Sequence, residues 1–207
     1  LAGRSGDNRH HGKVEVMIEF GIAQMSKPGF EHCGDGYVLE QHPKGALVAV
    51  IDGLGHGDKA YHAAQAAVAA LKHTPHDTPM SLMQRCHQAL TGTRGAVISM
   101  AALANDQLTW LGVGNVEGVL LHADAHRPRE RLLLRGGVVG YRMPTLRSFS
   151  LPLQRGDTLI FATDGVRSAF ADNLPLHATP QHIAQTILDT HCRHTDDALV
   201  LVVRYQP

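Results

Sequence analysis

Hydrophobic and polar residues alternate in several short segments of the chain, and this alternation is typical of β-strands with one buried face. In the first quarter the pattern predicts strands at 14–24, 37–41 and 46–51, the last two joined by a turn at Pro43-Lys44-Gly45. Further on it predicts strands at 96–103, 107–113, 117–122 and 131–134, with Asn105-Asp106 placed for a hairpin turn. Two apolar runs, 157–162 and 198–203, predict the remaining strands.

Three segments instead repeat their hydrophobic residues every three or four positions, which predicts helices. The first covers 59–72 with Asp58 as its expected N-cap, the second covers 79–90 with Thr78 as N-cap, and the third opens at Thr179-Pro180. Because the strands are joined mainly by hairpins and the helices are grouped between sets of strands, we predict an α+β fold. Its sheet should be mostly antiparallel and covered by helices, unlike a parallel βαβ fold.

Composition and charge narrow the class of protein. The 207 residues are 43% hydrophobic and carry 19 Lys and Arg against 19 Asp and Glu, so no positive field favours nucleic acid or a membrane surface as partner. No apolar run approaches the roughly 20 residues that cross a bilayer. Cys33, Cys86 and Cys192 are too widely spaced for a thiolate zinc motif or a disulfide framework, which predicts a reducing, cytoplasmic location. We expect residues 1–12 to be a disordered or added segment and 13–207 to form a single domain.

Four short acidic motifs stand at or beside the ends of predicted strands: Gly34-Asp35-Gly36, Asp52-Gly53-Leu54-Gly55-His56-Gly57, Thr163-Asp164-Gly165 and Thr195-Asp196-Asp197. Taken singly, an Asp-Gly pair most often marks a turn. Several carboxylates delivered to the edge of a core, however, need solvent, a partner or a cation, because an unpaired buried charge is costly. Oxygen ligands without Cys or His at metal-ligand spacing favour Mg²⁺ or Mn²⁺ over Zn²⁺.

In this order, and together with three further segments, these motifs resemble the metal-dependent protein phosphatases of the protein phosphatase 2C superfamily. The match is to its short bacterial SpoIIE-like branch, which includes stressosome phosphatases. The further segments are Thr93-Arg94-Gly95-Ala96, Gly112-Val113-Gly114-Asn115 and the ending 195–203, and the resemblance runs over residues 14 to 205. It implies an αββα sandwich of two antiparallel sheets flanked by helices, with metals bound at one end.

The resemblance also implies roles for individual residues. Asp52 would bridge two Mn²⁺ or Mg²⁺ ions, Gly53 would offer its backbone carbonyl, and Asp164 and Asp196 would complete the first site. Asp35 would hold water near the second ion. Gly34 stands where larger members carry a Glu and Asn115 where they often carry an Asp, which predicts a weaker second site and no third. Asp197 stands where many relatives have Asn.

The implied reaction is hydrolysis of phosphoserine or phosphothreonine by water that the two cations activate, with no protein nucleophile. The implied substrates are stressosome proteins with STAS domains, and anti-sigma-factor antagonists are the alternative. A catalytically dead binding module and a different metal hydrolase remain competing interpretations. Lys27, His32 and Arg94 are candidate phosphate contacts, and His56 a candidate acid, although solvated or structural roles are the simpler interpretation for each. Cys33 is expected to be a packing residue.

Overall fold

The computed structural model describes residues 18–206. The predicted N-terminal segment 1–12 and the first four residues of the first predicted strand lie outside this range. No helix within 18–206 combines the length and the apolarity that a bilayer crossing requires.

Ten strands, three α-helices and one short 3₁₀ helix follow one another along the described chain. In order they are β1 (Ile18–Met25), β2 (Asp35–His42), β3 (Gly45–Gly53), α1 (Asp58–His73), α2 (Pro79–Ala89), β4 (Ala96–Ala104), β5 (Gln107–Val113), β6 (Glu117–Leu121), β7 (Glu130–Arg131), β8 (Phe149–Pro152), β9 (Thr158–Ala162), η1 (Ser168–Ala171), α3 (Pro180–His191) and β10 (Ala198–Tyr205).

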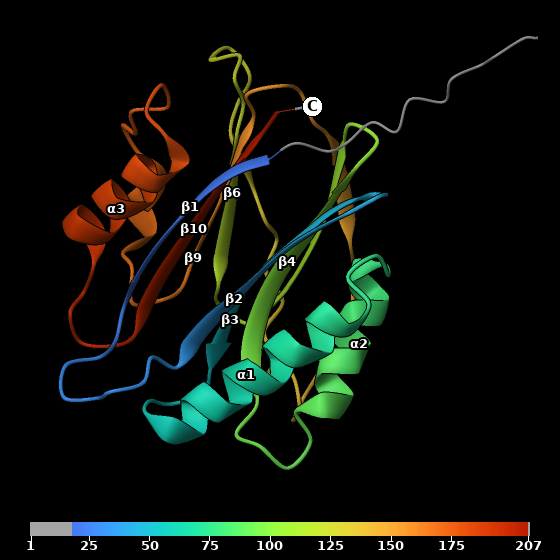
Figure 1. Ribbon diagram of the computed structural model, residues 1–207, viewed down its shortest axis with the longest axis vertical. Coiled ribbons are helices and arrows are strands. Elements are labelled where there is room, and N and C mark those ends of the chain that lie inside the picture. The colour runs from blue at the N-terminus through green and yellow to red at the C-terminus, as the bar shows by residue number, and fades with distance from the viewer. Residues whose placement is uncertain (1–17, 207) are drawn as a thin grey trace, which may run out of the picture.

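These elements form four layers (Figure 1). One sheet has the strand order β1-β10-β9-β6-β7 and the other β2-β3-β4-β5-β8, and every paired strand in both is antiparallel to its neighbour. Helix α3 packs on the outer face of the first sheet, and α1 and α2 pack on the outer face of the second. The predicted αββα sandwich is confirmed.

The main core lies between the two sheets, where Trp110 of one sheet and Phe161 and Tyr205 of the other belong to a single buried cluster. Two further clusters join each sheet to its helices. Since burying one large apolar side chain contributes roughly 1.5–3 kcal/mol, these three clusters are the main source of stability. The sheets therefore hold the strand ends, and any side chains on them, in fixed positions.

Local signals placed most of the element boundaries correctly. Asn105 and Asp106 both have positive φ, 51° and 56°, as a tight hairpin turn between β4 and β5 requires. The side chains of Thr78 and Thr179 accept hydrogen bonds from backbone N–H groups in the first turns of α2 and α3. The prediction that Asp58 caps α1 is wrong: Gly57, with φ of 67°, is the N-cap, and Asp58 is the first helical residue.

Two strand predictions fail between β6 and β9. The predicted strand 131–134 is reduced to the two residues of β7, because only Glu130 and Arg131 pair with β6. Strand β8 was missed because it is short and mostly exposed, and because Pro152 ends it. Its pairing with β5 joins residues about 40 positions apart, which local patterns do not reveal.

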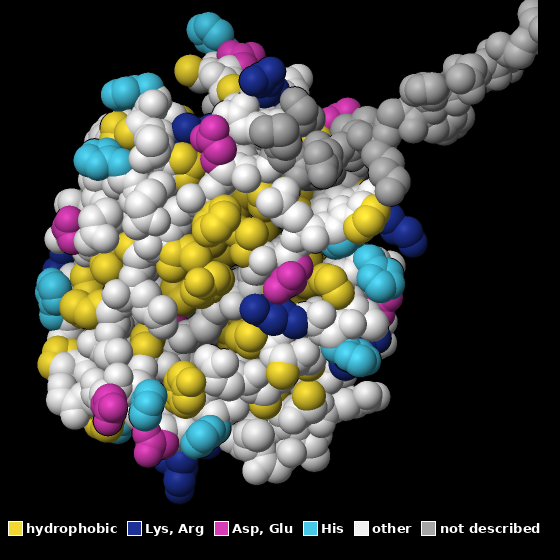
Figure 2. Space-filling model, viewed as in Figure 1, with side chains coloured by type: hydrophobic (Ala, Val, Ile, Leu, Met, Phe, Trp, Pro, Cys, Tyr) yellow, Lys and Arg dark blue, Asp and Glu magenta, His cyan; other side chains and the backbone are white. Residues whose placement is uncertain are grey.

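Strands β1 and β2 are edge strands of different sheets and lie side by side in Figure 1, where their outer edges make one face of the sandwich. Hydrophobic side chains gather at the centre of this face in Figure 2. Phe20 of β1 is 49% exposed and Tyr37 of β2 is 39% exposed.

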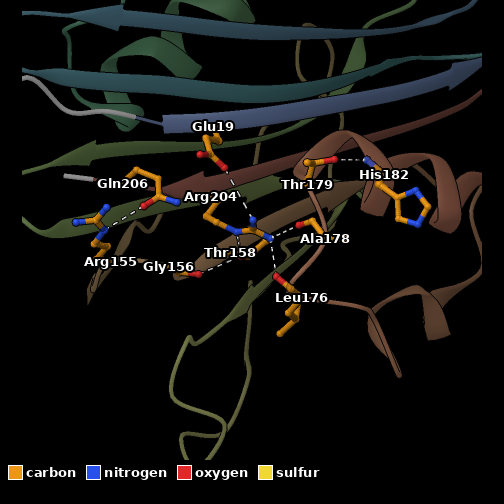
Figure 3. A network of polar contacts seen from close by, with 10 residues as sticks. All are labelled: Glu19, Arg155, Gly156, Thr158, Leu176, Ala178, Thr179, His182, Arg204 and Gln206. Carbon is orange, nitrogen blue, oxygen red and sulfur yellow. Dashed lines mark hydrogen bonds and ion pairs between the residues drawn. The ribbon is translucent and has the colours of Figure 1, made fainter.

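Arg204 of β10 connects the sheet to the segment that leads into α3 (Figure 3). Its Nη2 atom donates hydrogen bonds to the carbonyl oxygens of Leu176, at 2.7 Å, and Ala178, at 2.8 Å. Glu19 of β1 lies 3.9 Å from the same guanidinium group. The guanidinium group of Arg204 is therefore engaged in structural contacts.

Candidate metal centre and active site

The site begins with the register of β2 and β3. Asp35, the first residue of β2, is the direct partner of Asp52, the penultimate residue of β3. Directly opposite residues of an antiparallel pair point to the same side of the sheet. The pairing therefore places these two carboxylates side by side at one end of the sandwich.

The other sheet contributes carboxylates at the same end. Asp164 follows β9, and Asp196 precedes β10, its neighbour in the sheet. Both line a cavity of about 480 Å³ together with Asp52. Its remaining walls come from Leu54, Gly55, His56, Val97, Gly114, Asn115, Gly136, Gly137 and Val138. Asp35 lines a neighbouring cavity of about 300 Å³ that also includes Cys33 and Tyr61.

The carboxylates repel one another. Burial, followed by the charges of Asp164, Asp196 and Asp197, raises the pKa of Asp52 to about 8. Burial and the Asp52 charge also raise the pKa of Asp35 well above its ordinary value. A divalent cation would oppose both pKa increases, because it favours the charged form of each carboxylate.

The donor set fits Mg²⁺ or Mn²⁺, which prefer oxygen ligands. Within residues 18–206, however, no three carboxylate, imidazole or thiolate groups converge on a single point closely enough to hold an ion alone. An ion near Asp52 would therefore complete its coordination with backbone carbonyl groups and water. Mg²⁺ sites commonly keep several waters in this way.

Asn115 acts on Asp164 directly. Asn115 lies just before β6, and its Nδ2 atom donates a 2.8 Å hydrogen bond to Asp164 Oδ2. The neutral amide therefore orients a carboxylate, where an acid at the same position would repel it.

Sequence reasoning missed the part that Thr163 plays. Its hydroxyl donates a 2.8 Å hydrogen bond to Asp35 Oδ2 and accepts one from the Leu199 N–H at 2.9 Å. Thr163 is 2% exposed, so this is a buried connection between the two sheets. The Thr-Asp-Gly motif was noticed only for its Asp, and the partner 128 residues away gave no local signal.

Asp197 has a structural role, which its place next to Asp196 did not reveal. Its Oδ1 atom accepts a hydrogen bond from the Lys27 N–H at 2.8 Å, and its Oδ2 atom accepts one from the Gly34 N–H at 2.9 Å. The 4% exposed carboxylate thus closes both ends of the loop between β1 and β2. Because Gly34 precedes Asp35, Asp197 also fixes the position of that acid.

Two glycines allow α1 to approach the site. A Cβ atom on Gly34 would lie 2.8 Å from Ala60 Cβ and 2.9 Å from Asp197 Oδ2, so a Glu at this position would not fit without rearrangement. A Cβ atom on Gly53 would collide with the backbone carbonyl of Ala60. The missing carboxylate at Gly34 therefore reflects the packing of α1 against the loop.

Two of the candidate phosphate contacts, His32 and Lys27, contact neighbouring side chains and do not line the cavity. His32 is paired with Asp58, 3.1 Å away, and stacks on Tyr61, which supports a structural role. Lys27 lies over the Phe30 ring, with 5.9 Å between Nζ and the ring centroid. Phe30 in turn packs on His56, and only His56 of these lines the cavity.

Arg94 lies at the margin of the cavity, and its guanidinium group occupies the space beside Gly55 where a Cβ atom would project. Cys33 behaves as a packing residue: burial first, and then the Asp35 charge, raises the pKa of its thiol to about 12. Such a thiol is a poor nucleophile near neutral pH.

Comparisons with known proteins agree with this architecture. Residues 42–206 match the family of Stage II sporulation protein E (SpoIIE). The chain is 28% identical over 147 residues to the phosphoserine phosphatase RsbX of Bacillus subtilis (strain 168), an alignment that covers 70% of this chain and 73% of that protein.

Two solved structures superpose closely. A chain from work on the bacterial stressosome as a modular system adapted to control secondary messenger signalling has a TM-score of 0.83 and 28% identity, over 91% of this chain and all of that one. RsbX in complex with magnesium has a TM-score of 0.80 and 22% identity, over 91% and 96% of the two chains. The likeness to the magnesium complex concerns the fold.

The family match covers most of the described chain and includes the Asp52 motif, the Thr163-Asp164-Gly165 motif and the strand that begins after Asp197. The fold and the order of the acidic strand ends are those expected for this family. The chain therefore belongs to the SpoIIE family of protein phosphatase 2C-like phosphatases.

Proposed function

We propose that this protein is a phosphoserine and phosphothreonine protein phosphatase that depends on Mn²⁺ or Mg²⁺ held by Asp52, Asp164 and Asp196. The observation that carries the proposal is the shared cavity, which Asp52, Asp164 and Asp196 line from both sheets. Burial there, followed by the charges of Asp164 and Asp196, raises the pKa of Asp52. When bound, the ions would acidify water and offset the negative charge of the phosphoryl group.

The chain's own residues would keep this arrangement in place. Asn115 orients the carboxylate of Asp164, Thr163 holds Asp35 beside Asp52, and Asp197 fixes the loop before Asp35. No described thiol stands in this cavity to serve as a nucleophile, since Cys33 lines the neighbouring cavity and Cys86 and Cys192 are packed in the helical layers. The arrangement supports direct attack of water on phosphorus.

Phosphorylated STAS-domain proteins of a stressosome are the proposed substrates, and anti-sigma-factor antagonists are the second candidate. The support is the 28% identity to the phosphoserine phosphatase RsbX and to the chain from the stressosome work. Both candidate substrates present a phosphorylated side chain on a folded protein surface. An open cavity bounded by glycine backbone suits such a surface.

The proposal is tested by release of phosphate from a phosphoserine protein, followed by mass spectrometry. We expect turnover with Mn²⁺ or Mg²⁺, none after chelation, and recovery when the metal is restored. Asp164→Asn should prevent recovery. Full turnover with the chelator present would contradict the proposal, and metal binding without turnover of any phosphoprotein would favour a binding module.

Calorimetry tests the number of ions. We propose one tight and one weaker Mn²⁺ site, because Gly34 supplies no carboxylate and Asp35 is engaged by Thr163. Activity should rise over the concentration range of the weaker step, since activation of water needs both ions. Two equally tight steps, or full activity with one ion bound, would refute this part of the proposal.

A further inference from the structure

Arginine residues in this protein are distributed in two ways. Some are used in ion pairs with carboxylates of the fold. These are Arg85, Arg127, Arg129, Arg131 and Arg204. Within residues 18–206, four exposed arginines have no side-chain hydrogen bond or ion pair: Arg94, Arg142, Arg147 and Arg193. Their charges are therefore available to something outside the described chain.

Two of these, Arg94 and Arg142, border the carboxylate cavity or its continuation. Arg94 lies across Gly55, which lines that cavity. Arg142 lines a second cavity of about 500 Å³ with Gly136, Gly137, Met143 and Pro144. Gly136 and Gly137 belong to the walls of both cavities, so the second is the direct continuation of the first.

Backbone pairing joins the segments that carry the two arginines. Ala96 and Val139 form an antiparallel bridge, closed by hydrogen bonds of 3.0 and 2.8 Å between their N–H and C=O groups. Arg94 stands two residues before Ala96, and Tyr141 stands two residues after Val139. The chain turns at Gly140 and Val138 forms a second bridge with Arg142, so each arginine stands within three residues of the Ala96–Val139 bridge.

The surface between them has the composition of a binding site. Tyr141 is 84% exposed, and Met143 and Pro144 supply apolar contact area beside Arg142. Exposed Tyr and Arg are the residue types most often responsible for binding energy at protein interfaces. Arg135 precedes the shared glycines, and its Nε atom is buried without a hydrogen-bond partner within the described residues.

We infer that Arg94, Tyr141 and Arg142 form a docking surface for an acidic segment of the phosphoprotein substrate, next to the phosphorylated residue. This inference rests on the proposed function and specifies its substrate class. Charge complementarity is the argument: the carboxylate cavity repels an acidic segment, whereas the adjoining cavity presents unpaired guanidinium groups that attract it. Side-chain carboxylates are bound well by such groups.

The inference is tested with two phosphoserine peptides that differ only in their flanks, one with Glu and Asp and one with Gln and Asn. With Mn²⁺, the unmodified protein should hydrolyse the acidic peptide with about fivefold higher kcat/KM, mostly through KM, as expected for two exposed ion pairs. The preference should weaken as salt is added. Arg94→Gln with Arg142→Gln should bring the ratio of the two peptides close to one.

Arg155→Gln is the matched control, because Arg155 is exposed and bonds Gln206 at the opposite end of β9. It should leave the peptide ratio unchanged. Arg142→Glu is a second test that does not depend on loss of function, since it should shift the preference towards a peptide flanked by Lys.

An absent preference in the unmodified protein would overturn the docking surface while leaving the phosphatase proposal intact. An equal loss on both peptides in the double variant would also overturn it, because the arginines would then act on the phosphoryl group itself. Lack of metal-dependent turnover of every phosphorylated substrate would instead refute the proposed function, and the docking inference with it.

Discussion

Carboxylates at the two ends of β9 stand in opposite surroundings. At its start, Asp157 is 1% exposed and its oxygens accept hydrogen bonds from the Ala123 and Gln154 N–H groups, with His122 3.2 Å away. Beyond its end, Asp164 shares a cavity with Asp52, whose carboxylate has no hydrogen-bond donor within residues 18–206. The fold therefore satisfies the carboxylate of Asp157 completely and leaves that of Asp52 to an external partner.

This difference separates structural from functional acids better than burial does. Asp157 is buried and Asp52 is partly buried, but only Asp52 is surrounded by like charges. A carboxylate that is fully hydrogen-bonded has no need for a cation, whereas clustered carboxylates without donors do. Each of the following predictions contrasts the two ends.

The largest expected effect is the loss of turnover in Asp52→Asn. Removing residues one contact further from a metal already costs roughly 10- to 100-fold in activity or affinity, so loss of Asp52 should cost more than about 100-fold. Steady-state hydrolysis of a phosphoserine peptide with Mn²⁺ measures this. The variant should remain folded by circular dichroism, and near-normal turnover would refute the assignment.

The same substitution at the other end, Asp157→Asn, should act on stability. Breaking this saturated network leaves His122 and two backbone N–H groups poorly matched, which should lower the free energy of unfolding by about 3 kcal/mol. Denaturant titration measures the change. Turnover per folded molecule should equal that of the unmodified protein, and a specific loss of catalysis would show that the ends are coupled.

Asp197→Ala should combine both effects, because Asp197 is saturated like Asp157 but adjoins the cavity. Losing the acceptor for the Lys27 and Gly34 N–H groups should cost about 2 kcal/mol of unfolding free energy. Turnover should also fall, roughly 10-fold, because Asp35 is no longer held. Asp197→Asn keeps one acceptor oxygen, so its stability and turnover should lie between those of the unmodified protein and of Asp197→Ala. Identical stability and turnover in the two variants would contradict this role.

The last prediction concerns the pH dependence of the metal-free protein. The pKa of Asp52 is raised from 3.8 to about 8, so the folded state holds a proton that the unfolded chain releases. This stabilisation is complete below the unfolded pKa and is lost as the pH rises towards the folded value. In a chelator, the unfolding midpoint should therefore fall between about pH 5 and about pH 8.

Asp52→Asn supplies the control for this profile. Its metal-free midpoint should change less over the same range, and at the alkaline end it should exceed that of the unmodified protein. Asp157→Asn should retain the original slope. If the unfolding midpoint depends on pH equally in all three metal-free proteins, repulsion between the carboxylates of the cavity is already relieved by other means.

The sequence predicted the elements whose signals are local. The Asn105-Asp106 turn and the Thr78 and Thr179 caps depend on a few neighbouring residues, and the structure has all of them. Strand β8 depends on a distant partner and was missed, and the N-cap of α1 was placed one residue too late. Asp58 is a good capping residue by type, but a left-handed turn at Gly57 carries the chain into the helix.

The same distinction applies to the site. Each candidate carboxylate stands in a recognisable motif beside a strand end, and three of them meet in one cavity. The roles of Thr163 and Asp197 could not be predicted, because their partners lie 128 and at least 163 residues away. Contacts of this kind appear only after two sheets are packed together.

The hydrogen bond from Thr163 to Asp35 has a consequence for biosynthesis. It joins the two sheets across most of the chain, and β10 carries the Leu199 N–H that orients the Thr163 hydroxyl. A nascent chain that still holds β10 and the residues just before it inside the ribosome lacks the Leu199 N–H, Asp196 and Asp197 at the site. Metal-dependent activity should therefore appear only when β10 has been released, which would protect phosphorylated partners from incompletely synthesised enzyme.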